Sequence, residues 1–355
     1  MARRVIQREL TNAAIAELLA RAAETARMPL QKALRRASGK AFLWEQEVTQ
    51  LLQEGRSLTE LPGIGPHLSR IIRGWIETLP PLPQPPDIRK GFLTFPQARA
   101  VLSAKPDWSK ALKGDLQMHS QWSDGAASIA EMADAAAARG YEYIAITDHS
   151  KGLKIANGIN EAQLLEQAGE ICEINDQLVA SGQPVRVLRS IELNLDPQGR
   201  GDMDSGSLSQ LDLVLGSFHS ALRRNEDQTD RYLAALRNPD IQILGHPRGR
   251  IYNYRLGLTA DWARIFDRAA QLDKAVEIDA YPDRQDLSLS LVKIAKKSGC
   301  RISLGTDAHG VEQLRFMKLA LASALLAGVK RDRILNFMTR EELLCWVASV
   351  REGAK

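Results

Sequence analysis

Hydrophobic residues recur in two different patterns along the chain. Before residue 79 they follow helical spacing, as Ile15, Leu18, Leu19 and Ala22 do, which predicts a helix over 11–26 with Asn12 as its cap. The same spacing predicts further helices over 30–38, 41–53 and 66–78. After residue 113, short apolar runs alternate with helical patterns, which is typical of parallel strands joined by helices.

The second pattern contains seven strand-like runs. They cover 115–119, 143–149, 185–192, 212–219, 241–246, 274–279 and 301–309. Helical patterns lie over 128–139, 161–181, 228–237, 260–271, 287–298 and 313–326. Seven strands alternating with helices predict an α/β fold, a distorted (β/α)7 barrel that follows a small all-α domain. An ordinary eight-stranded barrel is the alternative.

Five of the six histidines stand at the end of a predicted strand: His119, His149, His219, His246 and His309. A sixth predicted strand ends in Glu192 instead. One histidine in such a place is more often a buried core residue than a ligand. Five in the same context favour a metal site, because the carboxyl ends of the strands of a parallel barrel meet at one face. Imidazoles and carboxylates together are suitable ligands for a divalent transition metal.

Residues 58–72 contain a tight turn before a predicted helix. The glycines of Pro62-Gly63-Ile64-Gly65 allow a positive φ and close backbone approach, and the helix that follows offers N–H groups to an anion. The stretch resembles a helix-hairpin-helix, a module that holds the DNA phosphate backbone without reading bases. The resemblance implies DNA contacts at Gly63, Ile64, Gly65, His67 and Arg70. A glycine-rich corner that binds nothing is the alternative, and we do not expect His67 to be a metal ligand.

Charge and proline content separate the two parts of the chain. Residues 1–90 hold 14 Lys and Arg against 9 Asp and Glu, whereas the rest holds 33 against 34. The basic excess thus coincides with the hairpin, which favours a nucleic-acid partner. Residues 78–86 contain five of the fifteen prolines, a composition that predicts a semi-rigid linker. We therefore expect a helix-hairpin-helix domain over 1–79, a linker over 80–107 that includes a short helix at 92–102, and a catalytic domain over 108–355.

Composition narrows the class of protein. No apolar run approaches the ~20 residues that span a membrane, and the first residues lack the apolar core of a signal peptide. Cys172, Cys300 and Cys345 are odd in number and lack CxxC spacing, which predicts free thiols in a reducing compartment. The sequence therefore predicts a cytoplasmic protein without a membrane partner.

Eight short motifs, in this order, resemble those of the PHP (polymerase and histidinol phosphatase) family. They are Asp115-Leu-Gln-Met-His119, Trp122-Ser-Asp-Gly125, Ile146-Thr-Asp-His149, Ile191-Glu192, Ser217-Phe-His219-Ser220, Gly245-His-Pro-Arg-Gly-Arg250, Val276-Glu-Ile-Asp279 and Gly305-Thr-Asp-Ala-His309. The likeness covers roughly 113–336 and is strongest to the PHP domain at the C-terminus of bacterial family X DNA polymerases. It implies a (β/α)7 barrel and a metal-dependent phosphoesterase. The segment between Pro80 and Lys113 is too short for a nucleotidyltransferase palm, so templated synthesis is not expected.

The resemblance also implies up to three divalent metal ions, Zn, Mn or Fe. It assigns His119, Glu192 and Asp307 to the first, with Gln117 beside them. It assigns Glu192, His219 and His246 to the second metal, and Asp124, His149 and His309 to the third. By this resemblance Glu192, His219, His246 and Asp307 carry the catalysis.

Gln117 departs from the family pattern, which usually has histidine at that position. An amide oxygen is a weaker ligand than an imidazole, so the first metal is expected to be loosely held, different in kind or absent. Direct ligation by Gln117 and a hydrogen bond from Gln117 to another group are equally consistent with the sequence.

Metals in such a site would lower the pKa of a bound water and activate it for attack on a phosphate ester. Arg248 and Arg250 follow His246 and are expected to bind the substrate phosphate, with surface salt bridges as the alternative. The leading hypothesis is an exonuclease-like DNA repair hydrolase that processes 3′ ends or abasic sites. The alternatives are a histidinol-phosphatase-like small-molecule phosphomonoesterase and a catalytically weak DNA-binding scaffold.

Overall fold

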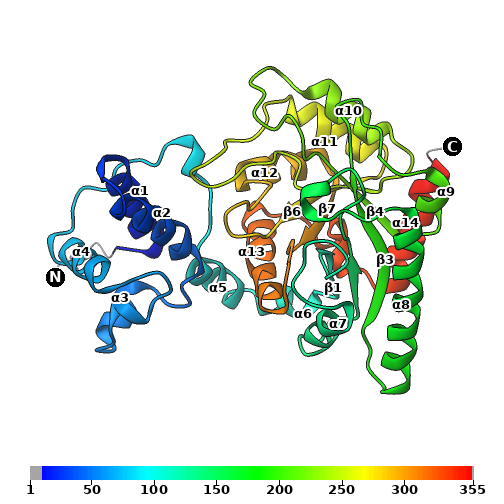
Figure 1. Ribbon diagram of the computed structural model, residues 1–355. Helices are drawn as coiled ribbons and strands as arrows, with labels where there is room; N and C mark the ends of the chain where they lie inside the picture. The colour runs from blue at the N-terminus through cyan, green and yellow to red at the C-terminus, as the bar shows by residue number, and fades with distance from the viewer. Residues whose placement is uncertain (1–9, 354–355) are drawn as a thin grey trace, which may run out of the picture. The chain divides into compact units, whose positions relative to one another are not determined.

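The computed structural model describes residues 10–353, which form two compact units (Figure 1). One unit comprises the chain up to Ala100 together with Ile251–Leu256. The other comprises Val101–Arg250 and the chain from Gly257 onward. The first boundary between the units therefore falls inside the segment 80–107 that the sequence marks as a linker. The short segment Ile251–Leu256 therefore belongs to the first unit, although the residues on both sides of it belong to the second.

The first unit is helical, with α1 (Asn12–Thr25), α2 (Leu30–Lys40), α3 (Val48–Gln53) and α4 (Pro66–Thr78). The helix predicted over 66–78 is confirmed, but the predicted cap of α1 is wrong. Thr11 caps α1 by accepting a hydrogen bond from the Ala14 amide. The buried Asn12 side chain instead accepts from Val48 N at 2.9 Å and donates to the Gln46 carbonyl at 2.8 Å. The Asn12 side chain therefore links α1 to the start of α3 and does not cap α1.

The single helix predicted over 41–53 is interrupted. A 3-10 turn η1 (Ala41–Leu43) leads into Trp44, whose backbone is extended, and α3 begins only at Val48. Trp44 is fully buried, and its indole Nε1 donates to the carbonyl of Pro62 at 3.2 Å. Burial of this indole beneath the hairpin turn outweighs helix continuation, since an aromatic ring of this size buries much apolar area.

The excursion Ile251–Leu256 completes the core of the first unit. Tyr252 is 8% exposed, and its hydroxyl lies 2.9 Å from the hydroxyl of Ser38. Its ring packs edge-on against Phe42 and Phe92, with centroids 4.8 Å and 5.2 Å away. This segment is thus part of the helical unit by packing, although it follows the barrel residue Arg250 in the chain.

The second unit is a barrel of seven parallel strands, in the order in which they occur along the chain. They are β1 (Gly114–Met118), β2 (Tyr143–Ile146), β3 (Arg186–Asn194), β4 (Leu213–Ser217), β5 (Ile243–Leu244), β6 (Ala275–Asp279) and β7 (Arg301–Gly305). The predicted (β/α)7 fold is confirmed. Residues 10–353 contain no eighth strand, so the alternative of an eight-stranded barrel is wrong.

The first and last strands close the barrel through their ends. His119 N donates to the Ala308 carbonyl at 2.8 Å, and Asp307 N donates to the Gln117 carbonyl at 3.0 Å. Nearer the start of β1, the Asn336 amide bonds both to the Gly114 carbonyl and to Leu304. One side chain therefore satisfies backbone groups that an eighth strand would otherwise pair.

Helices alternate with the strands, and several begin at the expected capping residues. They are α7 (Ile129–Ala137), α8 (Glu161–Ala180), α10 (Thr229–Arg237), α11 (Trp262–Gln271), α12 (Leu289–Ser298) and α13 (Met317–Ala327). Capping boxes start α7 at Ser128 and α8 at Asn160. The start of the helix predicted over 313–326 is instead a 3-10 turn, η5 (Val311–Phe316).

The sequence patterns did not predict the short helices α6 (Pro106–Ala111) and α9 (Ser205–Ser209) or the terminal helix α14 (Arg340–Gly353). The predicted helix at 92–102 occurs as α5 (Phe95–Ser103). Leu343, Trp346 and Val347 of α14 join a core cluster with apolar residues of β1 to β6. Within residues 10–353, no helix is both long and apolar enough to cross a membrane.

Candidate metal centre

The barrel gathers the predicted donors at the carboxyl ends of its strands. Glu192 lies within β3, and Asp124 lies in the loop that follows β1. The other donors lie one to four residues past the end of a strand: His119, His149, His219, His246, Asp307 and His309. Because parallel strands present their carboxyl ends at the same face, six distant segments contribute to one cluster.

Glu192 is the centre of the cluster and is fully buried. Its Oε1 lies 2.7 Å from Nε2 of His246 and 3.1 Å from Nε2 of His219. Its Oε2 lies 3.2 Å from Nδ1 of His149 and 3.4 Å from Nε2 of His119. The two carboxylate oxygens thus face two different sets of imidazoles, which is the arrangement of a bridging ligand.

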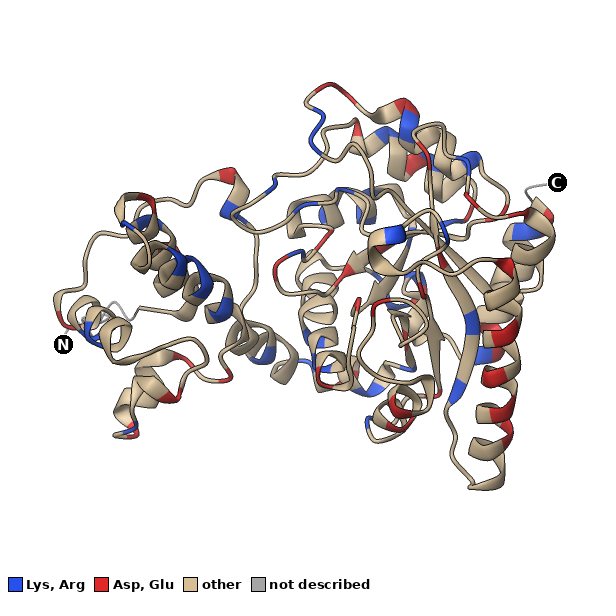
Figure 2. Ribbon diagram, in the orientation of Figure 1, with Lys and Arg blue, Asp and Glu red and all other residues tan. Residues whose placement is uncertain are grey.

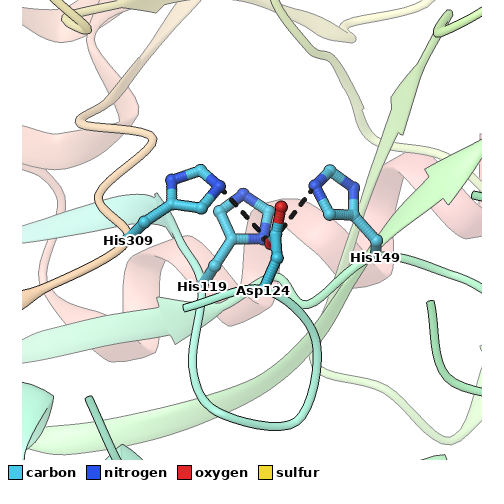
Figure 3. Close-up of side chains that lie close together, drawn as sticks. All are labelled: His119, Asp124, His149 and His309. Atoms are coloured by element: carbon cyan, nitrogen blue, oxygen red, sulfur yellow. Dashed lines mark ion pairs between the residues drawn. The ribbon is translucent and has the colours of Figure 1, made fainter. Parts of the chain in front are cut away.

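Asp124 is the focus of a second group, shown in Figure 3. Its Oδ1 lies 3.4 Å from Nε2 of His309, 3.7 Å from Nε2 of His149 and 4.0 Å from Nδ1 of His119. The rings of His149 and His309 each lie 4.4 Å, centroid to centroid, from the ring of His119. Asp124 is 31% exposed at its side chain, whereas His119 is buried, so this group reaches the mouth of the site.

The donor atoms fit divalent metal ions. Several are buried without a hydrogen-bond partner, namely Nδ1 of His119 and His149, Nε2 of His219 and His246, and both carboxylate oxygens of Glu192. Buried polar atoms normally have partners, so converging unpartnered lone pairs indicate a ligand set. Three sets lie close enough to hold an ion: His119, Asp124, His149 and His309; His149, Glu192 and His219; and His119, Glu192 and Asp307. His246 lies outside these sets although it contacts Glu192.

Neighbouring groups fix the orientation of two imidazoles. The Asn194 amide oxygen lies 3.1 Å from Nδ1 of His219, and the Asp307 carbonyl lies 2.8 Å from Nδ1 of His309. In each ring this leaves Nε2 directed toward a carboxylate of the cluster. Such outer contacts set the tautomer of a metal-binding histidine.

Asp148 supports the loop that carries Asp124. Its carboxylate accepts hydrogen bonds from the Ser120 and Ser123 hydroxyls, at 2.6 Å each, and from Gln167 at 2.7 Å. It therefore holds the loop after β1 and touches no imidazole nitrogen among the described contacts.

Gln117 faces a carboxylate rather than standing free in the cluster. In the orientation that satisfies both groups, its amide nitrogen donates to Oε2 of Glu277 at 2.9 Å. Glu277 also accepts from the backbone N–H of His246 at 2.6 Å. Burial raises the pKa of Glu277 to about 8, and the neighbouring charge of His246 opposes that rise. This contact is the hydrogen bond to a neighbour that the sequence allowed, and it uses the amide nitrogen, not the oxygen that would ligate a metal.

The charges of the cluster act on one another. Burial opposes ionisation of Glu192, but His149, His246 and His219 outweigh it and hold the pKa of Glu192 well below its usual value. Burial lowers the pKa of His246, whereas Glu192 raises it to about 10. Burial lowers the pKa of His309, and Asp124 and Asp307 raise it to about 9. These imidazoles compensate the carboxylates electrostatically, a task that cations perform in a metal centre.

The two arginines predicted to bind phosphate differ in their surroundings. Arg248 is half-buried, with an unpartnered Nε. Arg250 is only 4% exposed, and its Nε donates to the Arg284 carbonyl at 2.7 Å, so it supports a neighbouring turn. Arg284, which sequence reasoning missed, pairs its Nη1 with Oδ2 of Asp307. Only its place shortly after β6, two residues beyond Pro282, could have marked it in the sequence.

In the first unit, the turn residues Gly63–Gly65 lie between η2 (Leu58–Glu60) and α4, and α4 itself carries His67 and Arg70. Gly63 has a φ of +86°, which favours glycine, and Gly65 precedes α4 without a side-chain cap. Gly63, Gly65, His67 and Arg70 are exposed, whereas Ile64 is 5% exposed and anchors the turn in the core. Exposed Lys40 lies against the turn, since a β-carbon on Gly63 would stand 3.0 Å from its Cδ.

Fold and cluster together define a parallel barrel with a candidate metal centre at its strand ends. The family model described as the PHP domain matches residues 115–306, and the chain belongs to this family. As a member of the family, the chain is a metal-dependent hydrolase of phosphoester bonds.

Three similar proteins illustrate the range of relatives. The chain is 38% identical over 226 residues to the DNA polymerase/3′-5′ exonuclease PolX of Bacillus subtilis, a match that covers 63% of this chain and 39% of that protein. It is 26% identical over 214 residues to a probable phosphatase of Thermoanaerobacter sp., covering 59% of this chain and 83% of that one. A histidinol phosphate phosphatase of Lactococcus lactis, solved with zinc, L-histidinol and phosphate, superimposes with a TM-score of 0.46 at 19% identity. That structure matches 61% of this chain and 94% of its own.

Proposed function

We propose that the chain hydrolyses phosphoester bonds in DNA, at 3′ ends or abasic sites, by a metal-activated water. The observation that carries the proposal is the presence, in one chain, of the Glu192-centred donor cluster and of a hairpin turn flanked by Lys40. The first feature supports phosphoester chemistry and the second supports a polymeric phosphate substrate. The 38% identity to an exonuclease-bearing polymerase favours the same substrate class.

The cluster residues divide the work of such a site. Bound divalent ions would supply a water of lowered pKa and neutralise charge on the phosphate oxygens. Glu192, His219 and His246 would hold one ion and Asp124, His149 and His309 another, while His119 pairs with Asp307 beside Glu192. Asn194 keeps Nε2 of His219 available, and Asp148 keeps Asp124 in place. No serine or cysteine nucleophile is required.

We propose that residues 1–79 bind the DNA backbone and that residues 108–355 carry the chemistry, with 80–107 between them. Helix α2 carries Lys32, Arg35, Arg36 and Lys40 and no acidic residue, whereas α8 carries only acidic charges (Figure 2). Between α4 and β1 the chain forms only η3 (Asp87–Arg89), α5 and α6, which leaves no room for a polymerase palm. The match covers 39% of the length of the Bacillus polymerase, and for the chain described here we propose the hydrolysis alone.

A small-molecule phosphatase is the competing function, since the probable phosphatase of Thermoanaerobacter is matched over 83% of its length. Purified full-length protein with Mn²⁺ or Zn²⁺ would be assayed on 3′-labelled single-stranded DNA, on an abasic duplex and on a phosphate monoester. We expect kcat/KM on one of the DNA substrates to exceed that on the monoester. Turnover of the monoester alone would overturn the DNA assignment. Activity that persists after a chelator has removed the metal would overturn metal dependence.

A further inference from the structure

Arg284 brings a positive charge to the edge of the donor cluster. It lies in the turn after β6, where its Nη1 donates to Oδ2 of Asp307 and stands 3.8 Å from Oδ2 of Asp279. Its Cζ lies 5.5 Å from the centroid of the Tyr281 ring. The Arg284 carbonyl accepts a hydrogen bond from Nε of buried Arg250, which holds the backbone of the turn in place.

The two carboxylate oxygens of Asp307 have different partners. Its Oδ1 lies 3.0 Å from Nε2 of His119, whereas Oδ2 is committed to Arg284. The amide nitrogen of Gln117, the other residue of this corner, donates to Glu277. Two of the four residues expected around a first metal are therefore bound to protein groups. A guanidinium held against Asp307 would also repel a divalent cation there, because like charges at this range are disfavoured in a buried site.

Arg284 is also placed to contact a ligand. Its side chain is 33% exposed although its partners Asp307 and Asp279 are 1% and 0% exposed. Among the contacts of residues 10–353, only Nη1 of its guanidinium has a side-chain partner, which leaves the N–H groups of Nε and Nη2 for another acceptor. A planar guanidinium held by carboxylates is preorganised to bind phosphate oxygens.

We propose that Arg284 replaces a metal ion at the corner formed by Gln117 and Asp307, and that its outward N–H groups bind a non-bridging oxygen of the substrate phosphate. The chain then holds two metal ions and one arginine where the family pattern implies three metals. The inference rests on the proposed phosphoester hydrolysis and deepens it by assigning the residue that binds the phosphate. It also explains why glutamine is tolerated at position 117, since no ion there requires an imidazole.

The test measures metal content and phosphate binding directly. Full-length protein is loaded with Mn²⁺ and dialysed, bound metal per chain is determined by elemental analysis, and inorganic phosphate is titrated calorimetrically. We expect about two Mn²⁺ per wild-type chain by analogy with two-metal hydrolase sites. Arg284→Gln should keep this metal content and bind phosphate at least about tenfold more weakly, as expected for loss of a charge-assisted hydrogen bond. Arg189→Gln, which breaks an arginine–aspartate pair with Asp212 outside the cluster, is the matched control and should behave as wild type.

The double variant Gln117→His/Arg284→Gln tests whether Arg284 takes the place of a metal ion or only lies near the cluster. We expect it to bind a third Mn²⁺, whereas Gln117→His alone should not, because Arg284 still occupies Asp307. Three ions in the wild type, or phosphate affinity of Arg284→Gln within twofold of wild type, would overturn the inference. If Arg284→Gln is unfolded by circular dichroism, Arg284→Lys takes its place, with two ions and intermediate phosphate affinity expected. A wild type that binds phosphate but cleaves no ester would refute the proposed function and leave the role of Arg284 decided by the titration.

Discussion

The amide oxygen of Asn194 lies 3.1 Å from Nδ1 of His219, while Nε2 of the same ring lies 3.1 Å from Oε1 of Glu192. The ring N–H at Nδ1 therefore donates to Asn194, and the lone pair at Nε2 points into the cluster. Asn194 ends β3, the strand that also carries Glu192. One strand thus supplies both a bridging carboxylate and the group that orients the imidazole opposite it.

Replacing Asn194 tests this positioning. Asn194→Leu removes the acceptor at similar side-chain size, and we expect Mn²⁺ affinity to fall about 10- to 100-fold, as for other outer contacts of metal ligands. Asn194→Asp keeps an acceptor and should retain most of the affinity. Metal titration monitored by calorimetry provides the measurement. Equal affinity in the Leu variant and the wild type would show that His219 is oriented by other means.

His219 and His246 should each be necessary for hydrolysis. Both Nε2 atoms approach Oε1 of Glu192, so alanine at either position removes an imidazole from the same ion. We expect kcat/KM to fall at least about a hundredfold, or ~2.7 kcal/mol of transition-state stabilisation, without loss of the circular dichroism spectrum. Either variant retaining more than a tenth of wild-type turnover would contradict the assignment of that residue.

Lys40 should strengthen DNA binding through the hairpin turn. Its aliphatic side chain lies against the exposed Gly63 of the turn, which places its positive charge on the same surface. We expect Lys40→Gln to weaken single-stranded DNA binding several-fold and to reduce the salt slope by about one counterion. Lys297→Gln, an exposed lysine of α12, removes the same charge elsewhere and is the control. Fluorescence anisotropy at several salt concentrations gives both quantities, and identical slopes for the two variants would exclude a specific contact by Lys40.

The three cysteines should differ in reactivity. Burial raises the pKa of the Cys300 thiol to about 12, whereas Cys172 and Cys345 are exposed. At pH 8 the thiolate of Cys300 is then on the order of one part in ten thousand, and the thiolate is the reactive form. We expect two thiols per chain to react with Ellman's reagent in the native protein and three after denaturation. Because the pKa is raised, the third native thiol should gain reactivity only as pH approaches 12. Three fast-reacting thiols at pH 8 would contradict this burial.

Removal of the first unit should loosen the segment Ile251–Leu256 more than it disturbs the candidate metal donors of the barrel. Tyr252 has its partners Ser38, Phe42 and Phe92 in that unit. We expect residues 108–355 alone to hydrolyse a small ester, but to be cut by protease within 251–256 much faster than the full-length protein. Mass spectrometry of limited digests locates the cut. Equal protection of this segment in both proteins would show that the packing of Tyr252 is dispensable.

Sequence patterns were sufficient to predict the architecture of the barrel and to name the candidate donors at its strand ends. Alternation of apolar runs with helical patterns fixes seven parallel strands, and residues at the carboxyl ends of such strands must converge whatever the details of packing. The tight turn at Pro62–Gly65 was predictable for a local reason, since glycine permits the positive φ that Gly63 adopts. Local rules were less reliable where two residues competed, as Thr11 and Asn12 do for the cap of α1.

The directions of individual side chains and the loops that they contact could not be predicted and follow from long-range packing. Arg284 and Asp307 are 23 residues apart in irregular segments, where no periodicity indicates side-chain direction. Gln117 meets Glu277 across the barrel, a contact that depends on the packing of β1 near β6 and not on spacing along either strand. Tyr252 joins a core more than 200 residues earlier in the chain. Such contacts arise from burial and charge pairing over long sequence separations, whereas the sequence pattern carries mainly the local backbone preferences.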